Sequence, residues 1–238
     1  MSQFPQSQRR SWGLEYGTDN KVVFNFFNAV YAWMAVGLAV TAAVAWFVSQ
    51  SSVALHLIFG TPLRWALILG SVAIAWGVGS VALRISAAAA TALFLVYSAL
   101  VGAMISYIFL IYPTTTLVSA LVVTGGTFGG MSLYGYVTKR DLSGMGSILI
   151  MCFWGLFLAS IVNVFVASNA FSWFITYGVL VVFIGLTAYD TQKLRVIAEQ
   201  IGTNSDLAAR YAIVGSLNLY VDFINIFLSI LRIMGNRR

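Results

Sequence analysis

Charged side chains are scarce in this sequence. Only 8% of its 238 residues are Asp, Glu, Lys or Arg, whereas 60% are hydrophobic. A soluble domain normally carries about a quarter charged residues, which keep its surface hydrated. The composition therefore excludes an ordinary soluble globular protein, and lipid must cover most of the outer surface.

Cysteine and histidine are also nearly absent, with one residue of each, Cys152 and His56. A single cysteine excludes an intrachain disulfide, and its position in an apolar run predicts a buried, inert thiol. The lone histidine lies in the first predicted loop, away from any candidate serine nucleophile, which argues against a serine protease. The net charge of +6 comes from scattered basic residues, so the sequence offers no continuous patch for nucleic acid.

Long segments contain no charged residue or histidine, from Arg84 to Lys139 and from Asp141 to Asp190. Each gap is long enough for two membrane crossings of about 20 residues. The hydrophobic runs lie at residues 27–49, 65–83, 88–110, 115–137, 146–167, 171–190 and 211–233. We therefore predict an all-α integral membrane protein, with a polar N-terminal segment at 1–22 and a single seven-helix transmembrane domain at 23–238. Since the polar N-terminal residues pass into a long apolar run without a small-residue cleavage site, that helix is predicted to be retained.

The basic residues are distributed unequally between alternate loops. The N-terminal side carries Arg9, Arg10, Lys21, Arg84, Lys139, Arg140, Lys193, Arg195 and Arg210, and the other side carries Arg64, Arg232, Arg237 and Arg238. This bias predicts a cytoplasmic N-terminus. Seven crossings would place the C-terminus outside, but its basic tail favours the cytoplasm, as would six crossings and a re-entrant last segment. The side of the C-terminus stays open.

Small residues recur at helical spacing in the third and fourth predicted helices. Ser98, Gly102 and Ser106 are four residues apart, and the segment 125–130 contains two overlapping Gly-x-x-x-Gly pairs. In lipid, helices associate where small side chains let backbones approach closely. Both stripes are therefore predicted to be packing faces.

Among the few charged residues within or at the ends of predicted spans, three stand out: Arg84, Asp190 and Asp222. Such residues are costly in hydrocarbon unless paired or hydrated, which makes them functional candidates. By the predicted topology they lie toward the N-terminal side. Two neighbouring carboxylates cannot easily ionise together, whereas a guanidinium favours their ionisation, so a proton-sensitive latch is expected. The structural alternatives are an interfacial anchor for Arg84, a solvated helix end for Asp190 and a buried polar pin for Asp222.

Asp222 shares a predicted helix face with Asn218, Asn225 and Ser229, at spacings of four, three and four. This face must contact protein or water, and its polar members are candidates to line a pore. The oxygen atoms of Asp190 and Asp222 suit a hard cation such as Ca²⁺. Because the carboxylates are few, the expected binding is weak and transient, as conduction requires.

Three segments resemble the Bax inhibitor-1 family, also called the transmembrane BAX-inhibitor-motif family, and its bacterial members in particular. They are 132–146 (SLYGYVTKRDLSGMG), 188–192 (AYDTQ) and 219–225 (LYVDFIN). The resemblance extends over nearly the whole chain. It implies a seven-helix fold with the last helix surrounded by the others, in a bacterial inner membrane. It also implies a pH-sensitive calcium leak, in which Asp190 and Asp222 match the paired aspartates and Arg84 matches the arginine that latches to them.

The first functional hypothesis is thus a Ca²⁺ leak channel or transporter, sensitive to protons, with no tightly bound cofactor and no enzymatic activity. The alternative is a membrane protein that binds and regulates a membrane protease or a stress-response partner. An intramembrane aspartyl protease is disfavoured because no Gly-x-Gly-Asp precedes Asp222. A retinal protein is excluded because the last predicted helix contains no lysine.

Overall fold

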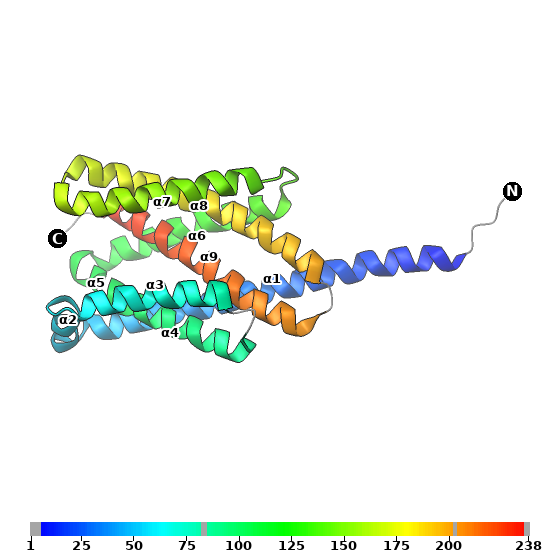
Figure 1. The fold of residues 1–238 in the computed structure, drawn as a ribbon, viewed down its shortest axis with the longest axis horizontal. Helices are drawn as coiled ribbons and strands as arrows, with labels where there is room; N and C mark the ends of the chain where they lie inside the picture. Colours follow the sequence, from blue (N-terminus) through cyan, green and yellow to red (C-terminus); the bar gives the residue numbers. More distant parts are fainter. Residues whose placement is uncertain (1–5, 82–84, 202–203, 236–238) are drawn as a thin grey trace.

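The computed structural model describes residues 6–81, 85–201 and 204–235, and within these ranges all regular structure is helical. Most helices run along one long axis, and α1 extends well beyond the bundle at one end (Figure 1). The elements are α1 (Gln6–Ser49), α2 (Ser52–Phe59), α3 (Leu63–Val81), α4 (Ala87–Ile105), α5 (Ile108–Ile111), α6 (Thr114–Val137), α7 (Ser143–Val166), α8 (Asn169–Ile201) and α9 (Ser205–Met234).

In the described part of the chain, 6 helices are long and apolar enough to cross a membrane. The number rises to 7 if α2 and the first part of α3, which meet at an angle of 75°, form one span. These counts agree with the prediction of an all-α integral membrane protein. The bend was not predicted; it occurs where Gly60 ends α2 and Pro62, which has no backbone N–H, precedes α3.

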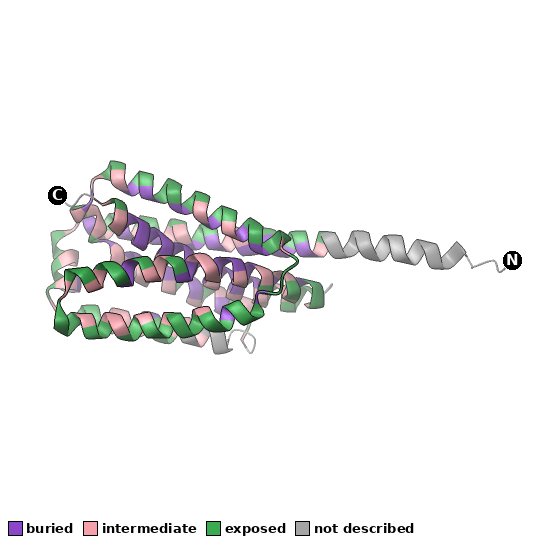
Figure 2. Cartoon of the chain, turned by 90° about the horizontal axis from the view of Figure 1, so that it is seen from above, coloured by how far each residue is buried: buried purple, intermediate pink, exposed green. Residues whose placement is uncertain are grey.

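Helix α9 lies at the centre of the bundle. In an 18-residue apolar window of α9, 72% of the residues are buried, compared with at most 33% in the corresponding window of any other candidate span and 0% in that of α7. It packs against α8, α1, α6 and α4, and Figure 2 shows that the buried residues gather on the inner helices. The predicted position of the last helix, surrounded by the others, is confirmed.

A hydrogen-bonded contact joins α9 to α1 and α4. Tyr220 is fully buried, and its hydroxyl lies 2.6 Å from Thr41 Oγ1. Because Thr41 donates its own proton to the Ser98 carbonyl at 2.9 Å, Tyr220 is the donor to Thr41. The bundle centre is thus fixed by polar contacts as well as by apolar packing.

The predicted small-residue face of α4 packs as expected. Ser98 and Ser106 are fully buried. A Cβ atom on Gly102 would lie only 2.6 Å from the Thr41 carbonyl oxygen, so α1 approaches α4 closely because this position has no side chain.

Two other expectations about packing were wrong. At Gly125, Gly126, Gly129 and Gly130 an added Cβ would meet nothing within 4 Å, so their face of α6 has no packing partner in the described chain. Cys152 is exposed, not buried, because α7 packs chiefly on α8 and leaves its other side free. Glycine spacing identifies a helix face that could pack closely, but not whether another helix lies against it.

The segment 132–146 instead packs on α8 through other glycines. A side chain at Gly135 would overlap the backbone of Ala188, and one at Gly146 would overlap the ring of Tyr189. One turn before Gly135, the Ser132 hydroxyl lies 3.2 Å from that of Thr191. Two of the segments that carry the family resemblance therefore contact each other in the fold.

We expect Gly135→Ala to lower the free energy of unfolding by about 1–3 kcal/mol, because the methyl group would overlap backbone that cannot rotate away. The matched control is Gly130→Ala on the same helix, where an added Cβ meets open space. It should be neutral, or stabilising by up to about 1 kcal/mol through helix propensity. Reversible unfolding in detergent micelles measures both. Equal effects would show that the contact between α6 and α8 is looser than the structure indicates.

Candidate functional site

A pocket of about 320 Å³ brings the two predicted aspartates together, at a place where α3, α7, α8 and α9 meet. Its lining consists of Ala75, Ile150, Phe153, Phe183, Leu186, Tyr189, Asp190, Lys193, Leu217, Asn218, Val221 and Asp222. Apart from the groups near the carboxylates, this lining is apolar. The pocket thus combines an apolar wall with a small number of carboxyl and amide groups.

Asp222 is the most deeply buried charged residue of the site, with 3% of its surface exposed. One carboxyl oxygen, Oδ2, has no hydrogen-bond partner among the residues that the structure describes. The Thr187 hydroxyl on α8 is a polar group close to this carboxyl. Leaving a buried polar atom unpaired costs free energy, so Asp222 is not a fully satisfied structural pin.

The Thr187 hydroxyl proton decides whether Thr187 can donate a hydrogen bond to Asp222 or only accept one. Thr187 Oγ1 donates to the Phe183 carbonyl at 2.8 Å, and a hydroxyl has only one proton to give. In that arrangement Thr187 can accept a hydrogen bond from Asp222 but cannot donate one to it.

Asp190 lies on α8 and is half-buried. Lys193, one turn further along, is the positive group that acts on Asp190 electrostatically, and its ammonium lies 6.0 Å from the centre of the Tyr189 ring. By its place in the sequence, Lys193 counts only among the basic residues of the loops. The signal that could have found it is its spacing of three from Asp190, which places both residues on one helix face.

Of the other predicted site residues on α9, one lines the pocket and two do not. Asn218, one turn before Asp222, lines the pocket. Asn225 and Ser229 lie further along α9 and do not, and the Asn225 side chain donates to the Val221 carbonyl at 2.8 Å. Arg84, the predicted latch, lies outside the described residues.

The loop between α6 and α7 is tied to α8 just beyond Asp190. Gln192 Nε2 donates to the Arg140 carbonyl at 2.7 Å, and its Oε1 accepts from the Leu142 backbone N–H at 2.8 Å. Arg195 donates to the Tyr136 carbonyl at 2.7 Å. In the sequence, Arg140 and Arg195 indicate only the topology, and nothing there predicts these bonds. Any movement of α8 at the pocket would therefore reach this loop directly.

Asp141 is in the same loop, outside the helices. It accepts hydrogen bonds from the Ser143 backbone N–H, at 2.9 Å, and from the Ser143 hydroxyl. These bonds hold the pKa of Asp141 below its ordinary value. Asp141 therefore stays ionised at neutral pH, beside Lys139 and Arg140.

The enclosed α9 and its buried carboxyl define a class of protein, the polytopic helical membrane proteins that hold an ionisable group within the bundle. Residues 23–238 match the family model described as "Inhibitor of apoptosis-promoting Bax1". The chain belongs to the Bax inhibitor-1 family.

Bacterial relatives match over nearly their whole length. The inner membrane protein YbhL of Escherichia coli (strain K12) is 48% identical over 215 residues, which cover 90% of this chain and 92% of the relative. An uncharacterized protein of Deinococcus radiodurans is 43% identical over 217 residues, covering 91% and 92%. Another of Borreliella burgdorferi is 41% identical over 214 residues, covering 90% and 92%. The family resemblance of the three sequence segments is confirmed.

Proposed function

We propose that this protein is a Ca²⁺ leak pathway of a bacterial inner membrane and that Asp190 and Asp222 sense pH. The observation that carries the proposal is a pocket among membrane-spanning helices that holds two carboxylates, one of them buried with an unpaired oxygen. Carboxylate and amide oxygens are ligands that Ca²⁺ accepts. Two carboxylates and the Asn218 amide form an incomplete shell, which suits brief binding during passage.

The route past the pocket would follow the polar face of α9. Asn225 and Ser229 continue that face beyond Asp222, and here they are enclosed: Ser229 is buried, and so are the neighbouring Ile226 and Ile230. These contacts support a closed pathway, because an ion needs a hydrated passage. Opening would require α9 and its neighbours to separate along this face.

Protonation supplies a physical switch for that opening. When both carboxylates are ionised they repel each other, and a nearby guanidinium or ammonium stabilises them. Arg84 is proposed to be this latch, and Lys193 adds a second positive charge beside Asp190. Acid would neutralise the carboxylates, release the latch and favour the open pathway.

The test is Ca²⁺ entry into vesicles that contain the pure protein and a calcium-sensitive dye, measured over a pH series. We expect entry above that of protein-free vesicles, rising as pH falls. An absence of protein-dependent flux at every pH would refute the leak, and it would favour the alternative of a regulator that binds a membrane partner.

Orientation can be tested separately. We propose that the N-terminus is cytoplasmic, as the Lys and Arg bias predicts. Lys139 and Asn169 flank α7 (Ser143–Val166), so one crossing separates them. Reporter fusions should place Lys139 in the cytoplasm and Asn169 on the opposite side. If both assignments were reversed, the aspartate pocket would face the other compartment.

A further inference from the structure

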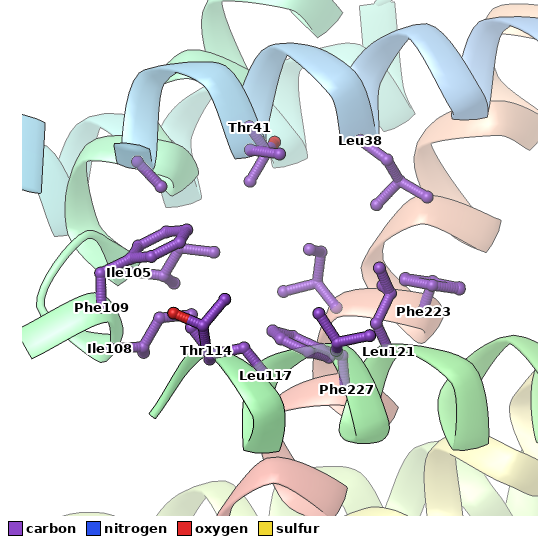
Figure 3. A pocket seen from close by; sticks show the side chains of 14 residues that line it. Leu38, Thr41, Ile105, Ile108, Phe109, Thr114, Leu117, Leu121, Phe223 and Phe227 are labelled. Atoms are coloured by element: carbon purple, nitrogen blue, oxygen red, sulfur yellow. The ribbon is translucent and has the colours of Figure 1, made fainter. Parts of the chain in front are cut away.

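A second pocket lies on the opposite side of α9 from Asp222, in the gap between α1 and α6. Its volume is about 320 Å³, and α9 supplies Phe223, Ile224 and Phe227 to its wall. Figure 3 shows the side chains of α1, α6 and α9 pointing into a common space, with Ile105, Ile108 and Phe109 closing one end.

The lining offers almost nothing to a polar ligand. Its polar residues are Thr41 and Thr114. The Thr41 hydroxyl is already bonded to the Ser98 carbonyl and to Tyr220. A water in such a space lacks the two to four partners that ordered buried water needs, and unfilled apolar space sacrifices packing contacts. The pocket therefore suits a flexible apolar group.

The pocket is open to the side of the bundle. Ala42 on α1 and Val118 and Leu121 on α6 line it and are also exposed on the surface of the chain. The opening lies within two membrane-crossing segments, Lys21–Ser49 and Thr114–Val137. The groups that meet it there are lipid acyl chains, because these fill the hydrocarbon between the two interfaces.

The same two helices also separate toward the other end of the bundle. A groove of about 510 Å³ lies there between Phe24 and Tyr31 of α1 and Gly129 and Leu133 of α6. A Cβ atom on Gly129 would meet nothing within 4 Å. The gap between α1 and α6 is thus a feature of both halves of the bundle, and the pocket in Figure 3 is its more apolar part.

We propose that the pocket between α1, α6 and α9 binds an acyl chain of a bilayer phospholipid. The acyl chain would lie against Phe223 and Phe227, filling space that no side chain of the described residues occupies. The site is independent of the aspartate pocket, since it lies on the other face of α9 and needs no ionisable group.

The test uses the full chain in nanodiscs that contain phosphatidylglycerol with a photoreactive group in its acyl chain. After illumination, the labelled residues are mapped by mass spectrometry. We expect label on Phe223 or Phe227, which are 8% and 9% exposed, as well as on annular positions such as Phe165, which is 84% exposed. Label confined to Phe165 and similar outer positions would overturn the proposal.

Paired variants identify the site. Ala42→Phe would fill the pocket, whereas Ala43→Phe adds the same ring at an exposed neighbour that does not line it. We expect at least about a tenfold loss of label on α9 in the first variant and little change in the second. Equal labelling of α9 in both would contradict the site.

A second pair covers the case in which Ala42→Phe fails to fold. Val118→Trp blocks the pocket from α6, and Val122→Trp, at an exposed position outside it, is the control. Loss of α9 labelling only in the first supports the proposal, and equal labelling rejects it. If α9 stayed unlabelled and a bifunctional cross-linker joined two copies of α6, a second protein molecule would be the occupant and the acyl chain would be excluded.

Discussion

Asp222→Asn is expected to leave the protein folded and to remove most of the pH dependence of Ca²⁺ flux. The amide has nearly the same shape as the carboxyl and can donate to Thr187, as a protonated carboxyl can. It cannot ionise, however, and it leaves Asp190 without a charged neighbour on α9. Since one linked proton changes an equilibrium by up to about tenfold per pH unit, the parent should show such a slope and the variant a nearly flat profile.

The matched control is Asp206→Asn, which removes another carboxylate from α9. Asp206 is 66% exposed and pairs with Arg210 at 2.8 Å, at the start of the helix and outside the pocket. This variant should keep the parent's pH profile. If Asp222→Asn unfolded the protein and produced no specific change in flux, Asp222 would be a buried structural pin.

The spans could be predicted because an uncharged run of about 20 residues has few alternatives in a membrane protein. The predicted runs at 88–110, 115–137 and 146–167 correspond closely to α4 with α5, to α6 and to α7. Helix ends were less predictable: α8 extends to Ile201, well beyond the run that ends at 190. There α8 becomes polar but continues, held by its bonds to the last turn of α6 and to the loop that follows it.

The two aspartates were identified from the free-energy cost of placing a carboxylate in the membrane, without knowledge of their surroundings. That reasoning placed Asp190, Asp222 and Asn218 together, and the pocket contains all three. It could not identify Thr187, because a threonine in an apolar helix is unremarkable until the α9 carboxyl is placed beside it. Contacts between distant helices depend on rotation and depth, which a hydrophobic run does not specify.

The glycines also show that the sequence of one helix does not predict which of its residues contact another helix. Gly129 and Gly130 belong to a recognised packing motif yet have open space above them, whereas Gly135 and Gly146 contact α8 closely. Spacing along one helix is a local property, but close approach depends on where the second helix lies. The segments 132–146 and 188–192 were recognised separately, and their contact became apparent only in the folded chain.

The proposed latch predicts that Arg84 and Asp190 act as one coupled unit. If the guanidinium holds the carboxylates while they are ionised, Arg84→Ala should raise flux at high pH, where the parent is closed. The variant's flux should then change less between high and low pH than the parent's. Asp190→Asn alone should also alter the profile, but in the Arg84→Ala background its effect should be much smaller. Flux across pH for the parent, both single variants and the double variant measures this coupling.

Two further double-mutant cycles test whether Arg84, and not another basic residue, is coupled to Asp190. Arg64 is near the start of α3, with its guanidinium over the Trp65 ring, whereas Arg84 follows the other end of that helix. Arg64→Ala should therefore combine additively with Asp190→Asn, because the two positions share no network. Lys193→Met tests the cation that lies one turn from Asp190 on α8. Suppose that Arg84→Ala combines additively with Asp190→Asn, whereas Lys193→Met does not. The latch would then be Lys193 on α8 and not Arg84. If both variants combine additively with Asp190→Asn, Arg84 is an interfacial anchor. The proposed mechanism would then lack the positive charge that holds the pathway closed.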